Sequence, residues 1–145
     1  MGRGVRKQIP REAHAAWEAK PDRRDPIELL VAQAVTRIPE LVPIRYGRML
    51  ASPFAFYRGA AAIMASDLAT LPHTGLQVQL CGDAHLSNFG VFASPERRLL
   101  FDLNDFDETL PGPFEFDVKR MAASFMIAAR NNGFSKADAR ASTLA

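Results

Sequence analysis

The chain has 145 residues, of which 48% are hydrophobic and 23% are charged, and its net charge is +2. This composition excludes an intrinsically disordered chain, and no apolar run reaches the roughly 18 residues that a membrane-spanning helix needs. The single cysteine, Cys81, excludes a disulfide framework. We therefore expect a folded protein that has no membrane partner.

The charges are unevenly distributed along the chain. Residues 1–50 carry ten basic and six acidic side chains, residues 81–117 carry two and eight, and residues 118–145 carry five and one. An acidic centre between basic flanks is unlike the stripe of Lys and Arg that nucleic-acid binding needs, so no nucleic-acid partner is expected. Clustered carboxylates are typical of a site for a hard cation such as Mg²⁺, and a solvated acidic loop is the alternative interpretation.

The N-terminal residues are basic, and no apolar segment typical of a secretory signal follows them. A free cysteine also fits a reducing compartment. These features favour a cytoplasmic protein. The sequence does not predict its oligomeric state.

The N-terminal part of the chain reads as an arm followed by a helix. Residues 1–24 are polar, and we expect an arm there with a short helix near residues 12–19. Asp25 and Pro26 are typical of a helix start, and apolar residues then recur at helical spacing. The pattern predicts a helix over residues 25–39.

The next segments are predicted to be two helices, an extended segment and a strand. Residues 43–50 and 60–71 have helical patterns, and the aromatic-rich residues 52–59 between them read as extended. Apolar and polar residues alternate over residues 76–80, which is typical of a half-buried strand.

The C-terminal half is predicted to begin with a β-hairpin and to end in helices. Residues 89–92 and 98–104 form its two strands, and residues 105–113 follow as a loop. Residues 116–131 form a long apolar helix, and Ser135 caps one more. The sequence therefore predicts an α+β fold that is mostly helical and contains a small hairpin.

Two polar clusters bracket the hairpin, at residues 82–88 and 102–108. Because a hairpin brings its strand ends together, we expect Asp83 and Asp105 to lie close in space. Phosphoryl transfer uses a carboxylate that accepts or orients the proton of the attacking hydroxyl, and an Asn and an Asp that hold Mg²⁺. Asp83 lies five residues before Asn88, as in kinase catalytic loops. If the two clusters are unrelated, Asp83 is a turn residue and Asn88 caps a strand.

Four further residues are candidates for the site. His85 is either a catalytic partner of Asp83 or a structural residue that fixes the loop. Asp107 is either a second metal ligand or part of a solvated edge. Asp117 opens the long helix, from which it can brace the loop. Arg58 either clamps a phosphate or pairs with a carboxylate.

A metal-dependent phosphoester hydrolase is a rival interpretation, because clustered carboxylates and a histidine can hold two metal ions. The other histidines, His14 and His73, show no metal-ligand spacing. The motifs Gly-x-Ser-x-Gly and His-Glu-x-x-His do not occur, which excludes the common serine hydrolases and zincins.

Five segments together resemble a known family. They are residues 42–49, 52–60, 80–90, 101–109 and 111–120. They resemble the signatures of a bacterial family of uncharacterised proteins, the domain of unknown function numbered 2252. That family is similar to the aminoglycoside phosphotransferase and choline kinase branch of the protein-kinase-like fold, whose catalytic loop reads His-Gly-Asp-x-His-x-x-Asn.

The resemblance implies a partial protein-kinase-like fold and a phosphotransferase that uses ATP and Mg²⁺ on a hydroxyl of a small molecule or a protein. It implies that Asp83 is the base, that Asn88 and Asp105 hold the metal, and that Asp117 braces the loop. Cys81 stands where the related enzymes have His. A non-catalytic module that binds a nucleotide or a partner is the alternative.

A kinase also needs a glycine-rich loop over the phosphates and a lysine on a strand. Neither precedes Asp83, and no lysine lies between Lys20 and Lys119, so the nucleotide-binding residues are not assigned. The resemblance implies a longer chain in which these elements follow the catalytic loop. We therefore expect residues 25–145 to be the N-terminal part of one domain and to be inactive alone. We also expect apolar surface to remain exposed on the helix at residues 116–131.

Overall fold

The computed structural model describes residues 2–145, apart from the side chains of Arg3 and Arg6. The helices are α1 (Gly2–Gln8), α2 (Pro26–Ala34), α3 (Val42–Met49), α4 (Pro53–Arg58), α5 (Ala61–Leu68), α6 (Glu115–Asn131) and α7 (Lys136–Leu144). The strands are β1 (Gln77–Leu80), β2 (Phe89–Ala93), β3 (Leu99–Leu103) and β4 (Leu110–Pro113). Short 3-10 turns lie at Arg11–His14, Pro39–Leu41 and Leu86–Asn88. The structure confirms the α+β class.

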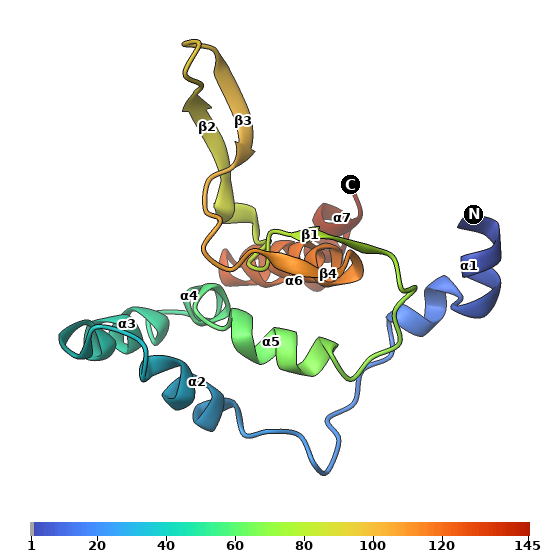
Figure 1. Ribbon diagram of the computed structural model, residues 1–145, viewed down its shortest axis with the longest axis horizontal. Helices are drawn as coiled ribbons and strands as arrows, with labels where there is room; N and C mark the ends of the chain where they lie inside the picture. Colours follow the sequence, from blue (N-terminus) through green and yellow to red (C-terminus); the bar gives the residue numbers. More distant parts are fainter. Residues whose placement is uncertain (1) are drawn as a thin grey trace.

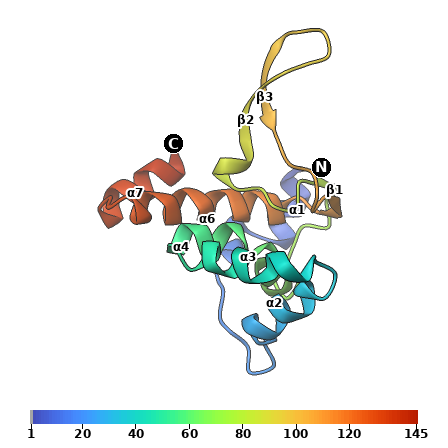
Figure 2. The same ribbon diagram turned by 90° about the vertical axis from the view of Figure 1, so that its left-hand side faces the viewer.

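Helix α6 lies at the centre of the molecule (Figure 1). Strands β1 and β4 run beside it, α7 packs against it, and α4 and α5 contact it from the other side. The hairpin formed by β2 and β3 projects away from this body, as both ribbon views show (Figure 2). The loops at the base of the hairpin therefore lie where the hairpin joins the helical body.

The four strands form two nested antiparallel pairs. Strand β1 pairs with β4, with Leu80 opposite Leu110, and β2 pairs with β3, with Phe89 opposite Leu103. The hairpin is confirmed. One polar loop connects β1 to β2 and the other connects β3 to β4, so the nesting places both loops at the junction of the two pairs.

The loop predicted at residues 105–113 is wrong in its second half, where residues 110–113 form strand β4. Pro111 and Pro113 make this segment a poor strand by local propensity. Its pairing with β1 is a tertiary contact between segments about 30 residues apart, which local propensity does not show.

The extended segment predicted at residues 52–59 is wrong, because these residues form α4. The Ser52 hydroxyl accepts a hydrogen bond from the Ala55 N–H at 3.0 Å, and Pro53 occupies the first turn. The Tyr57 hydroxyl donates to the Arg120 carbonyl at 2.6 Å. Capping and this tertiary contact together outweigh the β-propensity of the aromatic residues. Helix α2 has the expected Asp25 cap but ends at Ala34 rather than near residue 39.

The N-terminal arm contains α1, which was not expected, and the 3-10 turn at Arg11–His14 in place of the helix predicted near residues 12–19. Arg23 ties the arm to α5 through two hydrogen bonds to the Asp67 carboxylate, at 2.7 and 2.8 Å. Arg23 also lies over the ring of Trp17, which remains about half exposed.

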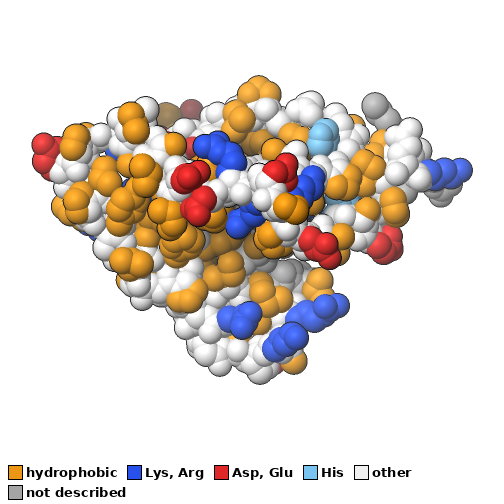
Figure 3. Space-filling model, turned by 90° about the horizontal axis from the view of Figure 1, so that it is seen from below, with side chains coloured by type: hydrophobic (Ala, Val, Ile, Leu, Met, Phe, Trp, Pro, Cys, Tyr) orange, Lys and Arg blue, Asp and Glu red, His pale blue; other side chains and the backbone are white. Residues whose placement is uncertain are grey.

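The buried core beneath α2, α3 and α5 is small. It contains Leu30, Met49, Ala60 and Ile63, with Leu29 and Tyr46 packed against it. Much apolar surface stays exposed on α2, α3 and the segment between them, at Ile27, Val31, Val35, Ile38, Leu41 and Ile44. Hydrophobic side chains gather on the left of the face seen in Figure 3, the side on which α2 and α3 lie.

The central helix also leaves apolar side chains exposed, as expected. Val118 is 58% exposed and Phe125 is 41% exposed. Among the helices that the structure describes, none combines the length and the apolar character needed to cross a membrane.

Candidate active site

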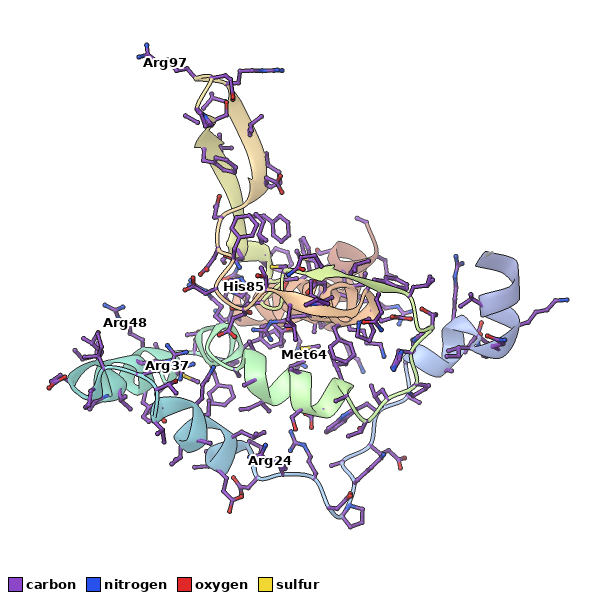
Figure 4. The ribbon with its side chains drawn as sticks, viewed as in Figure 1. Arg24, Arg37, Arg48, Met64, His85 and Arg97 are labelled. Atoms are coloured by element: carbon purple, nitrogen blue, oxygen red, sulfur yellow. The ribbon has the colours of Figure 1, made fainter. Side chains whose placement is uncertain are left out.

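A cavity of about 1000 Å³ opens between the polar loops and the helical segments before them. The two loops contribute Asp83, His85, Asn88 and Asp105 to its wall, and the α2–α4 region contributes arginines that include Arg58. A smaller cavity of about 190 Å³ shares several of these residues and adds Asp107 and Glu108. The structure thus brings Arg58, Asp83, His85, Asn88 and Asp105 to the larger cavity, and places Asp107 at the smaller one and Asp117 at neither. Figure 4 shows His85 near the centre of the molecule, at the base of the hairpin.

Gly82 allows the two loops to touch. Its φ is +81°, in the left-handed region that favours glycine. A Cβ atom at this position would collide with the backbone carbonyl of Glu108. A side chain would therefore separate the loop that carries Asp83 from the loop that carries Asp105.

Helix α6 holds the first loop at two points. The Asp117 carboxylate accepts hydrogen bonds from the backbone N–H groups of Cys81 at 2.7 Å and Gly82 at 3.1 Å. Further along the helix, the buried Ser124 hydroxyl accepts one from the Leu86 N–H at 3.0 Å. Three backbone donors of the loop are thus satisfied by one rigid helix, which fixes the path of the loop.

Asp83 forms an ion pair with the buried Arg120 of α6. Arg120 is 2% exposed, and its Nε donates to Asp83 Oδ1 at 2.6 Å, with a second contact from Nη2. Arg120 also donates to the Tyr57 carbonyl at 3.0 Å and lies over the Tyr57 ring. Burial alone would raise the pKa of Asp83, but the hydrogen bond with His85 and the Arg120 guanidinium outweigh it and hold that pKa below its usual range. Asp83 is therefore ionised at neutral pH.

The sequence prediction missed Arg120 as a site residue. One signal was available, since Arg120 follows Asp117 by three residues, a spacing that places both on one helix face. An arginine at a buried position of a helix needs a carboxylate partner, because an unpaired buried charge is costly.

His85 lies against Asp83 and is 4% exposed. Its Nε2 is 3.5 Å from Asp83 Oδ2, and its ring meets that of Phe54 edge-on. Its Nδ1 is buried and has no hydrogen-bond partner among the described residues. The Nε2 side of the imidazole therefore faces the Asp83 carboxylate, and Nδ1 stays unpaired.

Asn88 links the two loops and offers one oxygen to a ligand. Its Nδ2 donates to the carbonyls of Asp83 at 3.2 Å and Asp105 at 3.5 Å, so both N–H groups are used. No donor to Asn88 Oδ1 occurs in the part of the chain that the structure describes. The Asn88 amide oxygen and the Asp105 carboxylate both belong to residues of the cavity wall and are of the ligand type that Mg²⁺ prefers.

The ligand types present at the cavity are compatible with a Mg²⁺ ion that is also bound by phosphates and water. Across residues 2–145, no three His, Cys, Asp or Glu side chains come together as a ready metal site. Mg²⁺ usually takes one or two protein ligands and completes its shell with phosphates and water, so Asn88 and Asp105 are the residues that could hold it. Asp107 is exposed, and its N–H donates to Asp105 Oδ1 at 3.1 Å.

The environment of Cys81 does not favour a nucleophilic thiolate. Burial, together with the nearby Asp117 carboxylate, raises the pKa of its thiol to about 11. The thiol is therefore protonated at neutral pH and unreactive.

The fold and the site define an α+β structure in which the half-buried Asp83, paired with the buried Arg120 and His85, borders a polar cavity. Residues 37–144 match the family model described as "Uncharacterized protein conserved in bacteria (DUF2252)". This match covers most of the chain, and the chain belongs to that family. Searches of curated proteins and of solved structures gave no match.

Proposed function

We propose that this protein is a kinase-like phosphotransferase that moves the terminal phosphoryl group of ATP to a hydroxyl of a small molecule or a protein, with Mg²⁺ as cofactor. One observation carries the proposal: Asp83, Asn88 and Asp105 line one cavity. These residue types, in this order, are what phosphoryl transfer uses to orient a hydroxyl and to hold the metal.

Asp83 would orient the attacking hydroxyl and accept its proton. Its lowered pKa makes it a weak base, so the proton would move only once the oxygen–phosphorus bond is forming. This timing suits phosphoryl transfer, whose loose transition state demands positioning more than strong base catalysis. Arg120 and His85 would keep the carboxylate ionised and aimed.

Asn88 and Asp105 would hold the metal, which when bound supplies positive charge to the phosphate oxygens. The hydrogen bonds from Asn88 to the carbonyls of both loops would keep these two ligands in fixed relation. Asp117, through the backbone of Cys81 and Gly82, would fix the loop before the substrate arrives. Such preorganisation lowers the cost of reaching the transition state.

The test measures ATP consumption by the full-length protein in the presence of a library of hydroxyl-bearing metabolites. We expect Asp83→Asn and Asp105→Asn to lower kcat by roughly 100-fold to 10,000-fold. Asp102→Asn is the matched control, because Asp102 is an exposed carboxylate near the same loop that does not line the cavity. Activity that survives both site substitutions would overturn the assigned roles.

One observation favours a second candidate, a non-catalytic module that binds a nucleotide or a partner. The Arg120 ion pair occupies the carboxylate of Asp83 and weakens it as a base. Under this interpretation Asp83 is structural, and the cavity binds without turnover. Nucleotide binding with no ATP consumption across the whole library would select this candidate.

A further inference from the structure

The cavity has a second wall, made of arginines, that the proposed reaction does not use. Arg37, Arg45 and Arg58, here called the arginine wall, line both the larger and the smaller hollow. Arg48 joins them in the larger one. Figure 4 shows Arg37 and Arg48 on the α2–α3 side of the molecule, to the left of His85. These residues come from helical segments that precede the catalytic loop in the chain.

Arg45 has an unused donor in this wall. Its Nη2 donates to the Gly59 carbonyl at 2.6 Å and to Gln33 Oε1 at 3.3 Å, which fixes the guanidinium. Its Nη1 is buried and lacks a hydrogen-bond partner within residues 2–145. A buried donor without an acceptor is costly, and an anion in the cavity would remove that cost.

The carboxylates of the cavity do not contact the arginine wall directly. No ion pair joins Arg37, Arg45 or Arg58 to a carboxylate in the described part of the chain, although Asp105, Asp107 and Glu108 line the same hollow. Burial and the neighbouring charge of Arg37 lower the pKa of Arg45, and the charge of Glu108 opposes this shift only in part. Three guanidinium groups that line one cavity and make no ion pair there can attract an anion.

We propose that the arginine wall binds a phosphate group of a ligand held in this cavity. Guanidinium groups match phosphate oxygens through paired N–H donors, and several of them together favour a dianion over a single carboxylate. No lysine occurs between Lys20 and Lys119 to supply this charge. Two sources share this chemistry: the phosphates of a nucleotide, and a phosphate already present on the hydroxyl acceptor. Naming these sources rests on the proposed function, whereas the anion site itself does not.

The test is calorimetric titration of the full chain with inorganic pyrophosphate in EDTA, so that no metal takes part. We expect saturable binding that weakens roughly ten-fold or more in Arg58→Met and in Arg45→Met. Arg37→Met serves as a further variant, because Arg37 makes no side-chain hydrogen bond within residues 2–145 whose loss would perturb folding. Arg98→Met is the matched control, since Arg98 is exposed on the hairpin outside the cavity. The absence of binding, or equal binding by wild type and all three wall variants, would overturn the proposal.

Competition then separates the two sources. In the same EDTA buffer, displacement of pyrophosphate by ATP would assign the wall to the nucleotide, whereas displacement by glucose 6-phosphate and not by ATP would assign it to a phosphorylated acceptor. Displacement by neither would overturn the assignment to a substrate phosphate.

Asp105→Asn distinguishes this proposal from the proposed function. That variant should retain pyrophosphate binding in EDTA, because it removes a negative charge from the cavity, while losing ATP turnover. If the wild type binds pyrophosphate but does not consume ATP with any substrate, the proposed phosphotransferase activity is refuted and the anion site is still supported.

Discussion

The polar loop at residues 81–88 and the β2–β3 hairpin that follows it are adjacent in sequence but differ in what they bury. The loop buries polar side chains, with His85 4% exposed and Asn88 7% exposed, and α6 anchors its backbone. The hairpin exposes apolar side chains, with Leu99 79% exposed and Phe101 71% exposed. The more hydrophobic of the two segments is therefore the less buried one.

The difference shows that two kinds of interaction fix the conformation of these two segments. The loop is fixed by charged and polar contacts with one long helix, while the hairpin is fixed by its own strand pairing and extends away from the body (Figure 1). We therefore expect substitutions at the loop–α6 contacts to cost much more stability than substitutions on the hairpin.

The largest expected effect is at Arg120. Arg120→Met should lower the free energy of unfolding by about 4 kcal/mol, because it leaves the Asp83 carboxylate without its buried partner. Urea denaturation at neutral pH measures this change. Arg130→Met, in the exposed last turn of the same helix, should change stability by less than about 0.5 kcal/mol. Equal effects of the two variants would contradict the central role of the ion pair.

Gly82 comes next. Gly82→Ala should cost about 3 kcal/mol, because a side chain here combines an unfavourable positive φ with a collision against Glu108. Gly133 has the same φ of +81° but open space around it, so Gly133→Ala should cost only about 1 kcal/mol. Thermal denaturation compares the two, and a Gly82→Ala cost no larger than that of Gly133→Ala would show that the loops do not meet there.

Ser124→Ala should cost about 2 kcal/mol, because the Leu86 N–H would lose its acceptor in a buried place. The control is Ser142→Ala on the exposed side of α7, which should be close to neutral. Hydrogen exchange of the Leu86 amide gives a local readout, and unchanged protection in Ser124→Ala would rule out this anchor.

The pH dependence of stability tests the ionised state of Asp83. The folded-state pKa of Asp83 is lowered, so the stability it adds is present above the unfolded carboxyl pKa of about 3.9 and is lost as pH falls through the lower, folded value. The stability difference between wild type and Asp83→Asn should stay constant from about pH 7 to pH 5 and shift against the wild type in stronger acid. A shift already between pH 7 and pH 5 would mean that the pKa is raised instead.

The smallest effect should be on the hairpin. Phe101→Thr should change the free energy of unfolding by less than about 0.5 kcal/mol, because the ring is exposed and threonine keeps the strand propensity. Leu103→Ala, at a buried position of the same strand, should cost about 2 kcal/mol. A large loss at Phe101 would show that the hairpin surface is covered in solution.

Features set by local chemistry could be predicted from the sequence. The cap at Asp25, the cap at Ser135 and the end of α6 at Asn132 and Gly133 follow from rules that span a few residues. The hairpin and the closeness of Asp83 and Asp105 were also within reach, because a hairpin joins its own strand ends. Helix α4 and strand β4 were not, since contacts remote in sequence stabilise both.

The sequence by itself determined the helix starts at Asp25 and Ser135, the hairpin and the pair of polar loops that could carry chemistry. Only the tertiary structure decided that Arg120 pairs with Asp83 and that Arg37, Arg45 and Arg58 line the same cavity as Asp105. The physical reason is the sequence separation over which each kind of interaction acts. Capping and alternation act between near neighbours, whereas an ion pair across 37 residues exists only once α6 has packed beneath the loop.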